Sequence, residues 1–341
     1  MRQPRRAEAD YPANPSGLCA AHQGGNMSGM ESADESISKD LLWPKLRLDA
    51  WEETNKTLHM WTQVIGKIRL KLAPMVNHWW QVPLYVTTRG LTTSPIPYGS
   101  RIFQIDFDFF TSDMHILTDM GENRQIALRP RSVADFYLTT METLKSLGIE
   151  VSIWTTPVEV DERIPFELDT KHSAYDRRYV RRCWQVLSQA DRLMKQFRAG
   201  FAGKVSPVHF FWGGFDLAVT RFSGRGAPVR EPVPNVAHFV VAEAYSHEVS
   251  SCGFWPGAGL GIPAFYSYAY PEPEGFDSYP VQPRDAYYHP DLREFILPYE
   301  AVRATQSPDE TLLSFFESTY KAAANLGKWD RTSLEYSRTW K

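Results

Sequence analysis

The sequence predicts an α+β protein made of two pseudo-repeated units, each containing a helix, an antiparallel sheet and a closing helix. Residues 78–89 read HWWQVPLYVTTR and residues 209–221 read HFFWGGFDLAVTR. Both segments start with histidine, pass through an aromatic cluster into an apolar strand pattern, and end in Thr-Arg. Each follows a long amphipathic helix pattern and precedes further strand patterns. A match at a separation of about 130 residues indicates two copies of one unit.

The length of 341 residues also favours two domains, because a single hydrophobic core rarely grows that large. We expect a first α+β unit over residues 41–160, a second with longer loops over 161–330, and a C-terminal tail over 331–341. Residues 1–40 are rich in Pro, Gly, Ser and charged residues and lack apolar periodicity, which predicts a disordered leader. The start codon is open among Met1, Met27 and Met30.

The first unit is expected to open with a helix. Asp49 stands three residues before Glu52, a capping-box pattern in which Asp49 accepts from amides of the first turn. Apolar residues then recur at helical spacing, and Pro74 ends the helix. These residues are Trp51, Leu58, Trp61, Ile65, Ile68 and Leu72.

Strands and a second helix complete the first unit. Phenylalanine and isoleucine alternate with Gln104, Asp106 and Asp108, a pattern typical of a half-buried antiparallel strand. Further strands are predicted over 79–88, 114–118, 124–128 and 149–154. Ser132 is expected to cap a helix that ends at Gly148.

The second unit repeats this order with longer loops. We predict a helix over about 176–200, a strand over 215–222, a short helix over 236–245 and strands near 246–254 and 264–270. A final helix begins after Ser307 and Pro308 and ends at Leu326-Gly327. We expect a pseudo-twofold pair, with the interface between the copies as the place for a pocket.

Composition excludes several classes of partner. The net charge is −3 and no long Lys/Arg block occurs, which argues against nucleic acid binding. No apolar run reaches the roughly 18 residues that a membrane span needs, so no membrane association is predicted. The three cysteines form no CxxC pair, which fits a reducing cytoplasm and argues against a disulfide framework or zinc site.

Familiar catalytic motifs are incomplete. His247-Glu248 begins like the zinc-protease HExxH, but Ser251 stands where the second histidine belongs. Gly257-Ala258-Gly259 lacks the βαβ context of a dinucleotide loop, and no phosphate-binding GxxxxGK[ST] loop or GxSxG nucleophile elbow occurs. The sequence therefore predicts neither a metal site nor an organic cofactor.

Residues 244–257 resist a purely structural interpretation, because polar side chains over 246–251 interrupt a core strand pattern. Buried polar groups cost about 1–3 kcal/mol each unless hydrogen-bonded. One hypothesis is a catalytic network of His247, Glu248, His209 and Asp216 with Arg221. The alternative is that His247-Glu248 caps an edge and His209 is a core histidine with its hydrogen bonds satisfied. A pair between His247 and the thiolate of Cys252 is a weaker hypothesis, because buried cysteine usually packs as an apolar side chain.

Further residues are candidates for binding a ligand. Arg89 and Arg221 occupy the same place in the two copies and could hold an anion, or could pair with carboxylates for structure. Tyr266, Tyr268 and Tyr270 share one strand face and could line a cleft. The full set of candidate binding residues is Arg221, Arg89, His78, Trp212, Trp255 and Tyr268. Asp106 and Asp108 point the same way, but a solvated strand face explains them as well as a carboxylate pair does.

Several longer strings resemble a known family. They are Asn77–Trp80, VPLYVT (82–87), GLTTSPIPYG (90–99), HFFWGGFDLAVTRFSGR (209–225), AYSHEVSS (244–251), GFWPG (253–257) and YAYPEPEGF (268–276). Over about residues 41–330 the chain resembles the bacterial family of domain of unknown function 5996. The resemblance implies a widespread soluble bacterial protein. It implies no reaction, cofactor or catalytic residue.

Two classes of function follow. The first is a protein that binds or hydrolyses a small polar or anionic molecule in an aromatic-lined pocket of the second unit. The second is a non-catalytic protein–protein interaction module. For the first class, His247→Ala and Arg221→Ala should leave thermal stability nearly unchanged. Whether the chain is an enzyme, which ligand it binds and its oligomeric state stay open.

Overall fold

The structure is a computed structural model that describes residues 39–231 and 236–336. The predicted leader (1–40) and the choice of start codon therefore lie almost wholly outside the described residues, as does the end of the predicted tail. Within the described part of that tail, Arg331–Leu334 form the short helix α8. All the described residues belong to one compact unit.

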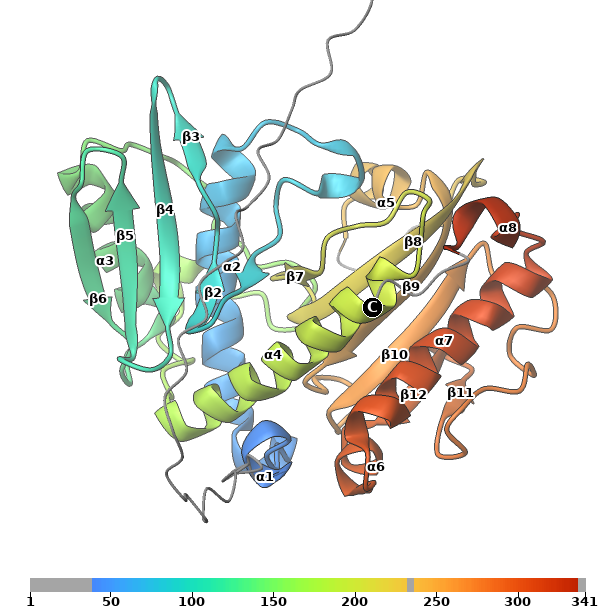
Figure 1. Ribbon diagram of the computed structural model, residues 1–341. Helices are drawn as coiled ribbons and strands as arrows, with labels where there is room; N and C mark the ends of the chain where they lie inside the picture. The colour runs from blue at the N-terminus through green and yellow to red at the C-terminus, as the bar shows by residue number, and fades with distance from the viewer. Residues whose placement is uncertain (1–38, 232–235, 337–341) are drawn as a thin grey trace, which may run out of the picture. The chain divides into compact units, whose positions relative to one another are not determined.

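The first sheet and its helices occupy the N-terminal half of this unit (Figure 1). The helices are α1 (Lys39–Leu42), α2 (Glu52–Leu72) and α3 (Val133–Ser146), with 3-10 turns η1 (Leu48–Ala50), η2 (Asn77–Trp79) and η3 (Phe166–Leu168). The strands are β1 (Tyr85–Val86), β2 (Gly90–Thr92), β3 (Ile96–Tyr98), β4 (Arg101–Asp108), β5 (Asp113–Thr118) and β6 (Asn123–Ala127). They form sheet 1, antiparallel in the order β1-β2-β4-β5-β6, with β3 also paired to β4.

Sheet 1 follows the predicted alternation in β4 and departs from the prediction elsewhere. Phe103, Ile105 and Phe107 are buried in the core, while Gln104, Asp106 and Asp108 lie on the opposite side. The predicted strand 79–88 is wrong for most of its length, because η2 precedes a two-residue strand. His78 and Trp79 have positive φ angles of 58° and 60°, so the chain turns where extended backbone was expected.

The helices of the first unit end where the sequence predicts, but one cap differs. Ser132 caps α3 by accepting from the amide of Asp135, and Gly148 follows it with a φ of +71°. Asp49, however, lies in η1 and pairs with Arg47, while α2 begins one turn later without a side-chain cap. The capping-box prediction is wrong because the Arg47 guanidinium binds the carboxylate that would have capped the helix.

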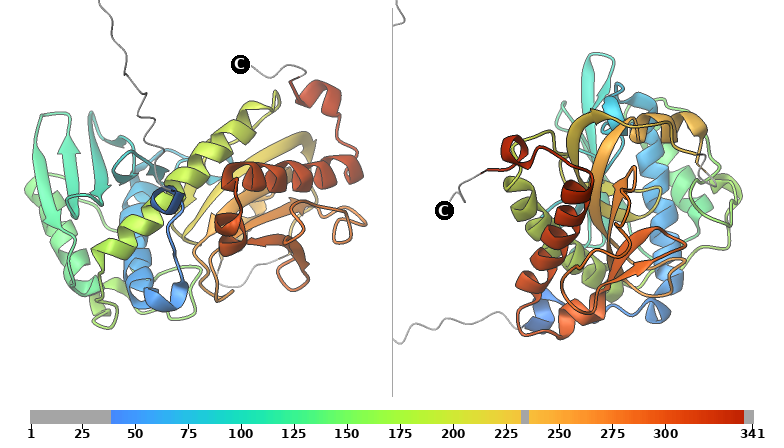
Figure 2. Two further views of the ribbon diagram at one scale, coloured as in Figure 1. Left: turned by 60° about the horizontal axis from the view of Figure 1, so that its bottom comes forward. Right: turned by 90° about the vertical axis from the view of Figure 1, so that its right-hand side faces the viewer.

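The C-terminal half builds a second antiparallel sheet. Its helices are α4 (Arg177–Ala199), α5 (His238–Ala244), α6 (Tyr299–Ala304) and α7 (Pro308–Leu326). Its strands are β7 (His209–Phe211), β8 (Asp216–Gly226), β9 (His247–Trp255), β10 (Ala264–Tyr270), β11 (Tyr287–His289) and β12 (Glu294–Pro298). Sheet 2 has the order β11-β12-β10-β9-β8-β7. Helices α4 and α7 lie side by side along one of its faces (Figures 1 and 2).

The two halves share one hydrophobic core. Leu84 and Phe210 exchange backbone hydrogen bonds of 2.9 Å and so join the start of the β1 segment to β7. The long helix α2 lies between the sheets (Figure 1), and its His59 donates to the carbonyls of Trp212 and Gly213. This central position explains why α2 buries polar as well as apolar side chains along most of its length.

The fold class is confirmed as α+β with two sheet-containing units. Each unit opens on a long helix, continues into an antiparallel sheet and closes on another helix. The local match between 78–89 and 209–221 does not extend to conformation, because His78 lies in a turn and His209 in a strand. The predicted strand 149–154 is irregular, since the ammonium of Lys67 binds the carbonyls of Trp154 and Thr156 in place of a neighbouring strand.

Candidate functional site

The strand register of sheet 2 separates the residues of the predicted catalytic network. Arg221 of β8 is opposite Ser250 of β9 in the strand register, so both side chains project to the same face. Glu248, two residues before Ser250, lies on this face too, and α4 and α7 cover it. Asp216 and His247 fall on the opposite face, since successive side chains of a strand alternate. We call the face that carries Arg221 the helix face. The face that carries Asp216 we call the tyrosine face, after Tyr266, Tyr268 and Tyr270. The structure therefore does not assemble the five-residue network.

Arg221 is a buried structural cation on the helix face. Its side chain is 2% exposed, and its guanidinium donates to the carbonyl of Phe197 at the end of α4. The guanidinium carbon lies 3.4 Å from the ring centre of Phe197 and 4.3 Å from that of Tyr320. Glu317 on α7 is 3.8 Å away. These contacts fix α4 and α7 to the sheet and leave Arg221 out of reach of a ligand.

Glu248 and Cys252 share the helix face with Arg221. Glu248 accepts from Ser223 at 2.8 Å and pairs with Arg225 at 2.6 Å. Cys252 is 2% exposed, and burial raises the pKa of its thiol well above the usual range. Because His247 lies on the other face, the structure excludes a thiolate–imidazole pair between Cys252 and His247.

His209 is enclosed by aromatic side chains. The centre of its ring lies 5.8 Å from that of Trp80, 5.6 Å from that of Tyr85 and 5.4 Å from that of Phe211. Burial, with the nearby Arg69 and Arg198 charges, lowers the pKa of His209 to about 3. The ring is neutral at physiological pH, and within the described part of the chain its Nε2 has no hydrogen-bond partner. His209 is therefore a core histidine as the alternative expected, but its hydrogen bonding is not satisfied.

His78 and His247, from opposite halves of the chain, lie together. Their ring centres are 5.4 Å apart. The Nδ1–H of His78 donates to the carbonyl of Glu243 at 3.2 Å, and its Nε2 accepts from the ammonium of Lys204 at 2.7 Å. Burial, followed by the Lys204 charge, lowers the pKa of His78. Lys204 also lies 5.2 Å from the ring centre of Trp80, a contact that the sequence did not indicate.

The remaining candidate binding residues lie apart. Arg89 is in the β1–β2 turn and pairs with Asp108 at 2.5 Å, so it is not equivalent to Arg221. Trp212 is buried against Gly66 of α2 and donates to the carbonyl of Val82 at 2.9 Å. Trp255 ends β9 and packs beside a small apolar cluster on the tyrosine face.

The tyrosine face holds a hydroxyl–carboxylate pair. Tyr266 on β10 lies flat across β9 above Gly253, where any Cβ would collide with its ring. This position lets its hydroxyl donate to Asp216 on β8. Burial raises the pKa of Asp216 to about 6, although the hydrogen bond from Tyr266 opposes the rise.

Asp216 acts on two further carboxylates that were missed from the sequence. A Cβ at Gly214 would lie 2.9 Å from Asp216 Oδ1 and 3.5 Å from Glu159 Oε2, so both carboxylates meet over this glycine. Glu159 is otherwise exposed, but enclosure of its carboxylate and the charge of Asp216 raise its pKa to about 7. Burial and the same charge raise the pKa of Glu294 on β12 to about 7.

Aromatic side chains flank these carboxylates. The rings of Tyr266 and Tyr268 stack with centres 6.3 Å apart, and the hydroxyls of Tyr268 and Tyr245 are 3.2 Å apart. The guanidinium carbon of Arg230 lies 3.8 Å from the ring centre of Tyr245 and 5.3 Å from that of Tyr270. The face thus presents acidic groups beside rings that already hold one cation.

Comparison with known proteins assigns the family. The model of the family described as "Family of unknown function (DUF5996)" matches residues 43–336. The chain belongs to this family. No curated protein and no solved structure matches it significantly. Family membership confirms the resemblance seen in the sequence, and the description of the family assigns no function.

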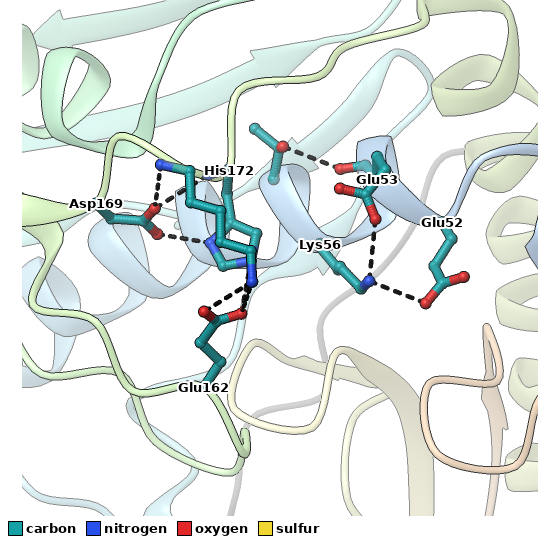
Figure 3. Close-up of polar contacts among 8 residues, drawn as sticks. Glu52, Glu53, Lys56, Glu162, Asp169 and His172 are labelled. Carbon is teal, nitrogen blue, oxygen red and sulfur yellow. Dashed lines mark hydrogen bonds and ion pairs between the residues drawn. The ribbon is translucent and has the colours of Figure 1, made fainter.

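A second polar cluster in this family member has a structural role (Figure 3). His172 lies between Asp169, whose carboxylate contacts its Nδ1 at 2.8 Å, and Glu162, 3.8 Å from its Nε2. The carbonyls of His172 and Asp169 accept from the amides of Val133 and Ala134 in the first turn of α3. The Asp169–His172 pair therefore fixes the turn that caps this helix.

Within 39–231 and 236–336, no group of three or more His, Cys, Asp or Glu side chains is arranged to bind a metal ion. In the same ranges every helix is too short or too polar to cross a lipid bilayer.

Proposed function

We propose that the tyrosine face of sheet 2 binds a small molecule through a positively charged group, such as an amine. The observation that carries this proposal is that three carboxylates, those of Asp216, Glu159 and Glu294, gather on one face. Burial raises the pKa of all three, and the charge of Asp216 raises the pKa of the other two further. Raised carboxyl pKa values report desolvation and mutual repulsion, and a bound cation relieves both.

The aromatic rings favour the same ligand. A cation over the face of tyrosine is attracted by the ring quadrupole by about 0.5–2 kcal/mol, depending on desolvation. Arg230 already makes this contact with Tyr245 and Tyr270. An anionic ligand is less favoured here than the sequence suggested, because Arg221 is buried on the helix face and Arg89 is paired in sheet 1.

The same groups suit acid–base chemistry. Asp216 and Glu159, with pKa values of about 6 and 7, both change protonation near neutral pH, where general acid–base catalysis is most effective. Hydrolysis of the bound molecule is the catalytic form of this proposal. A cytoplasmic location also belongs to it, because Cys183 and Cys252 are free thiols, as is usual in reducing compartments.

The proposal is tested by calorimetric titration of the full chain with putrescine and, as an uncharged analogue of similar shape, 1,4-butanediol. Putrescine should bind and butanediol should not. Affinity should rise on the order of tenfold from about pH 5.5 to about pH 8 as the carboxylates ionise. Tetramethylammonium serves as a second cationic probe that cannot donate a hydrogen bond.

Matched variants locate the binding. Asp216→Asn and Glu294→Gln should each weaken putrescine binding by about tenfold. Glu248→Gln removes a carboxylate from the helix face of the same sheet and should leave binding unchanged. Equal binding of butanediol, or equal losses in all three variants, would contradict the proposal, and so would a failure of both cationic probes to bind.

A protein–protein interaction module is the second candidate function, and one observation favours it. Trp154 and Leu168 are 64% and 66% exposed, and the hydrogen bond from the amide of Phe166 to the carbonyl of Thr155 brings their segments together. Exposed apolar side chains that cluster often mark a partner surface. Under this proposal, Trp154→Ala should abolish association with a captured partner and leave putrescine titrations unchanged.

A further inference from the structure

Sheet 1 carries a hollow on the face that its core does not use. The hollow has a volume of about 360 Å³ and is lined by residues of β2, β4 and β5 and of the turns before and after β2. That volume falls in the range of small-molecule pockets, about 300–1,000 Å³. It lies in the first unit and shares no lining residue with the tyrosine face of sheet 2.

A cross-strand row forms the centre of the hollow. Asp106 of β4 is opposite Thr92 of β2 on one side and His115 of β5 on the other. Residues opposite one another in antiparallel strands project to the same face, about 4.5–5.5 Å apart. The amide nitrogen of Gln104 donates to both oxygens of Asp106, at 2.8 and 2.9 Å. This bond fixes the carboxylate and leaves the amide oxygen of Gln104 as an acceptor.

The rim of the hollow is electrically neutral. Arg89 pairs with Asp108 at 2.5 Å, and Asp108 also accepts from the amides of Phe110 and Thr111. Arg89 is therefore unavailable as an uncompensated cation for a carboxylate or phosphate, and Asp106 would repel either. The aliphatic side chain of Leu117 completes the lining with an apolar surface.

The geometry points to a second ligand site, one that takes an uncharged polyhydroxylated molecule of about monosaccharide size. A hydroxyl both donates and accepts hydrogen bonds. The row offers acceptors in Asp106 and the Gln104 amide oxygen, a hydroxyl of both kinds in Thr92, and a ring nitrogen in His115. An ammonium only donates and a carboxylate only accepts, so each would leave part of this row unsatisfied.

This site is independent of the cation site proposed for sheet 2. The two differ in the chemical class of the ligand, in the sheet that holds it and in the residues whose substitution should remove it. A single pair of experiments on the full chain therefore separates them.

The experiment is a saturation-transfer NMR titration of the full chain with D-glucose, D-galactose and myo-inositol. At least one should bind, and Asp106→Ala and His115→Ala should each weaken it by about tenfold. Gln125→Ala is the matched control, because Gln125 is opposite His115 on exposed β6 yet does not line the hollow. It should bind like the wild type, as should Asp216→Asn.

Three results would overturn the inference. They are no binding of any of the three probes, binding that Asp106→Ala and His115→Ala leave unchanged, and displacement of the probe by putrescine. Circular dichroism of each variant confirms folding. Should Asp106→Ala fail to fold, Thr92→Val removes a hydroxyl from the same row with little change in volume, and the same loss of binding is expected.

Discussion

On the helix face of sheet 2, Arg221 reaches between α4 and α7 and touches three aromatic rings. On the tyrosine face of the same strand, five residues earlier, Asp216 accepts from Tyr266 and lies beside two further carboxylates. Both residues are charged and both belong to β8. The first is enclosed by a carbonyl, aromatic rings and a carboxylate of opposite charge, whereas the second lies among like charges.

The comparison shows that the surroundings of a charged residue decide its role more than its type does. Arg221 has a carbonyl, a carboxylate at 3.8 Å and aromatic rings around it. Its Nε has no hydrogen-bond partner among the described residues, but it is buried and closed off from a ligand. Asp216, Glu159 and Glu294 leave a surplus of negative charge. This surplus of negative charge, together with partial exposure, marks the tyrosine face as the better candidate site.

The largest expected effect is on the helix face. Arg221→Ala should lower the free energy of unfolding by about 3–5 kcal/mol, because it removes a buried, hydrogen-bonded side chain and opens a cavity under α4 and α7. This reverses the expectation from the sequence that Arg221→Ala leaves stability unchanged. Chemical denaturation measures the loss.

Arg221→Met is the matched variant for this prediction. It fills most of the volume with an apolar chain and needs no counter-charge, so it should recover more than half of the lost stability. If the alanine variant instead keeps wild-type stability, the contacts of Arg221 do not hold the helices, and the contrast between the two faces fails.

A glycine tests the packing of the tyrosine face. In Gly253→Ala the added methyl would collide with the carbonyl of Leu217 and the ring of Tyr266, which should cost about 2–3 kcal/mol through overpacking. Displacement of Tyr266 should also remove its hydrogen bond to Asp216. Gly226→Ala on β8 is the control, because its new Cβ would meet only Ser246 O at 4.0 Å, and it should stay near wild-type stability.

Elements with strong periodicity were predictable from the sequence. Strand β4 and helices α3, α4 and α7 appear where alternation or helical spacing places them. Short strands such as β11 and β12 have too few residues for a period to show. The left-handed turn at His78-Trp79 depends on tertiary contacts, including the bond from the His78 amide to Glu243 at 2.9 Å, which no local pattern reveals.

The candidate site was predictable only in part. The period of a strand correctly placed Tyr266, Tyr268 and Tyr270 on one face. Alternation within β8 alone places Arg221 and Asp216 on opposite faces, and within β9 it does the same for Glu248 and His247. Only the matching of the faces of the two strands needs the register between them, which the sequence does not contain. Glu159 comes from an irregular segment, so its approach to Asp216 is a purely tertiary event.

The carboxylates of the two faces should also differ in how their contribution to stability depends on pH. Burial first, then Asp216, raises the pKa of Glu294 to about 7 from 4.5. The folded state therefore holds this proton more tightly than the unfolded state does, and the associated stability is present below about pH 4.5 and lost as pH rises through about 7. Glu294→Gln should stabilise the protein at about pH 8 by on the order of 2 kcal/mol after allowance for partial exposure.

Thermal unfolding of Glu294→Gln at several pH values provides the measurement, with Glu248→Gln as the control from the helix face. Glu248 is hydrogen-bonded to Ser223 and paired with Arg225, so its replacement should lower stability at about pH 8 by up to about 1 kcal/mol. A gain of equal size in both variants would show that overall charge, and not the repulsion on the tyrosine face, sets the pH dependence.

The smallest effect is expected at the junction of the two sheets. His247→Ala should change the free energy of unfolding by less than about 1 kcal/mol, because His247 is half-buried and, among the described residues, its ring nitrogen is hydrogen-bonded only to the neighbouring Ser246 hydroxyl, at 3.0 Å. His78→Ala should cost more, about 2 kcal/mol, since it removes a buried ring bonded to Glu243 and Lys204.

Chemical denaturation of the two single variants and the double variant gives the coupling energy between His247 and His78. Additive losses would mean that the histidines only lie near each other, whereas a coupling above about 0.5 kcal/mol would show that His247 supports the turn at His78 and belongs with the structural residues of this fold.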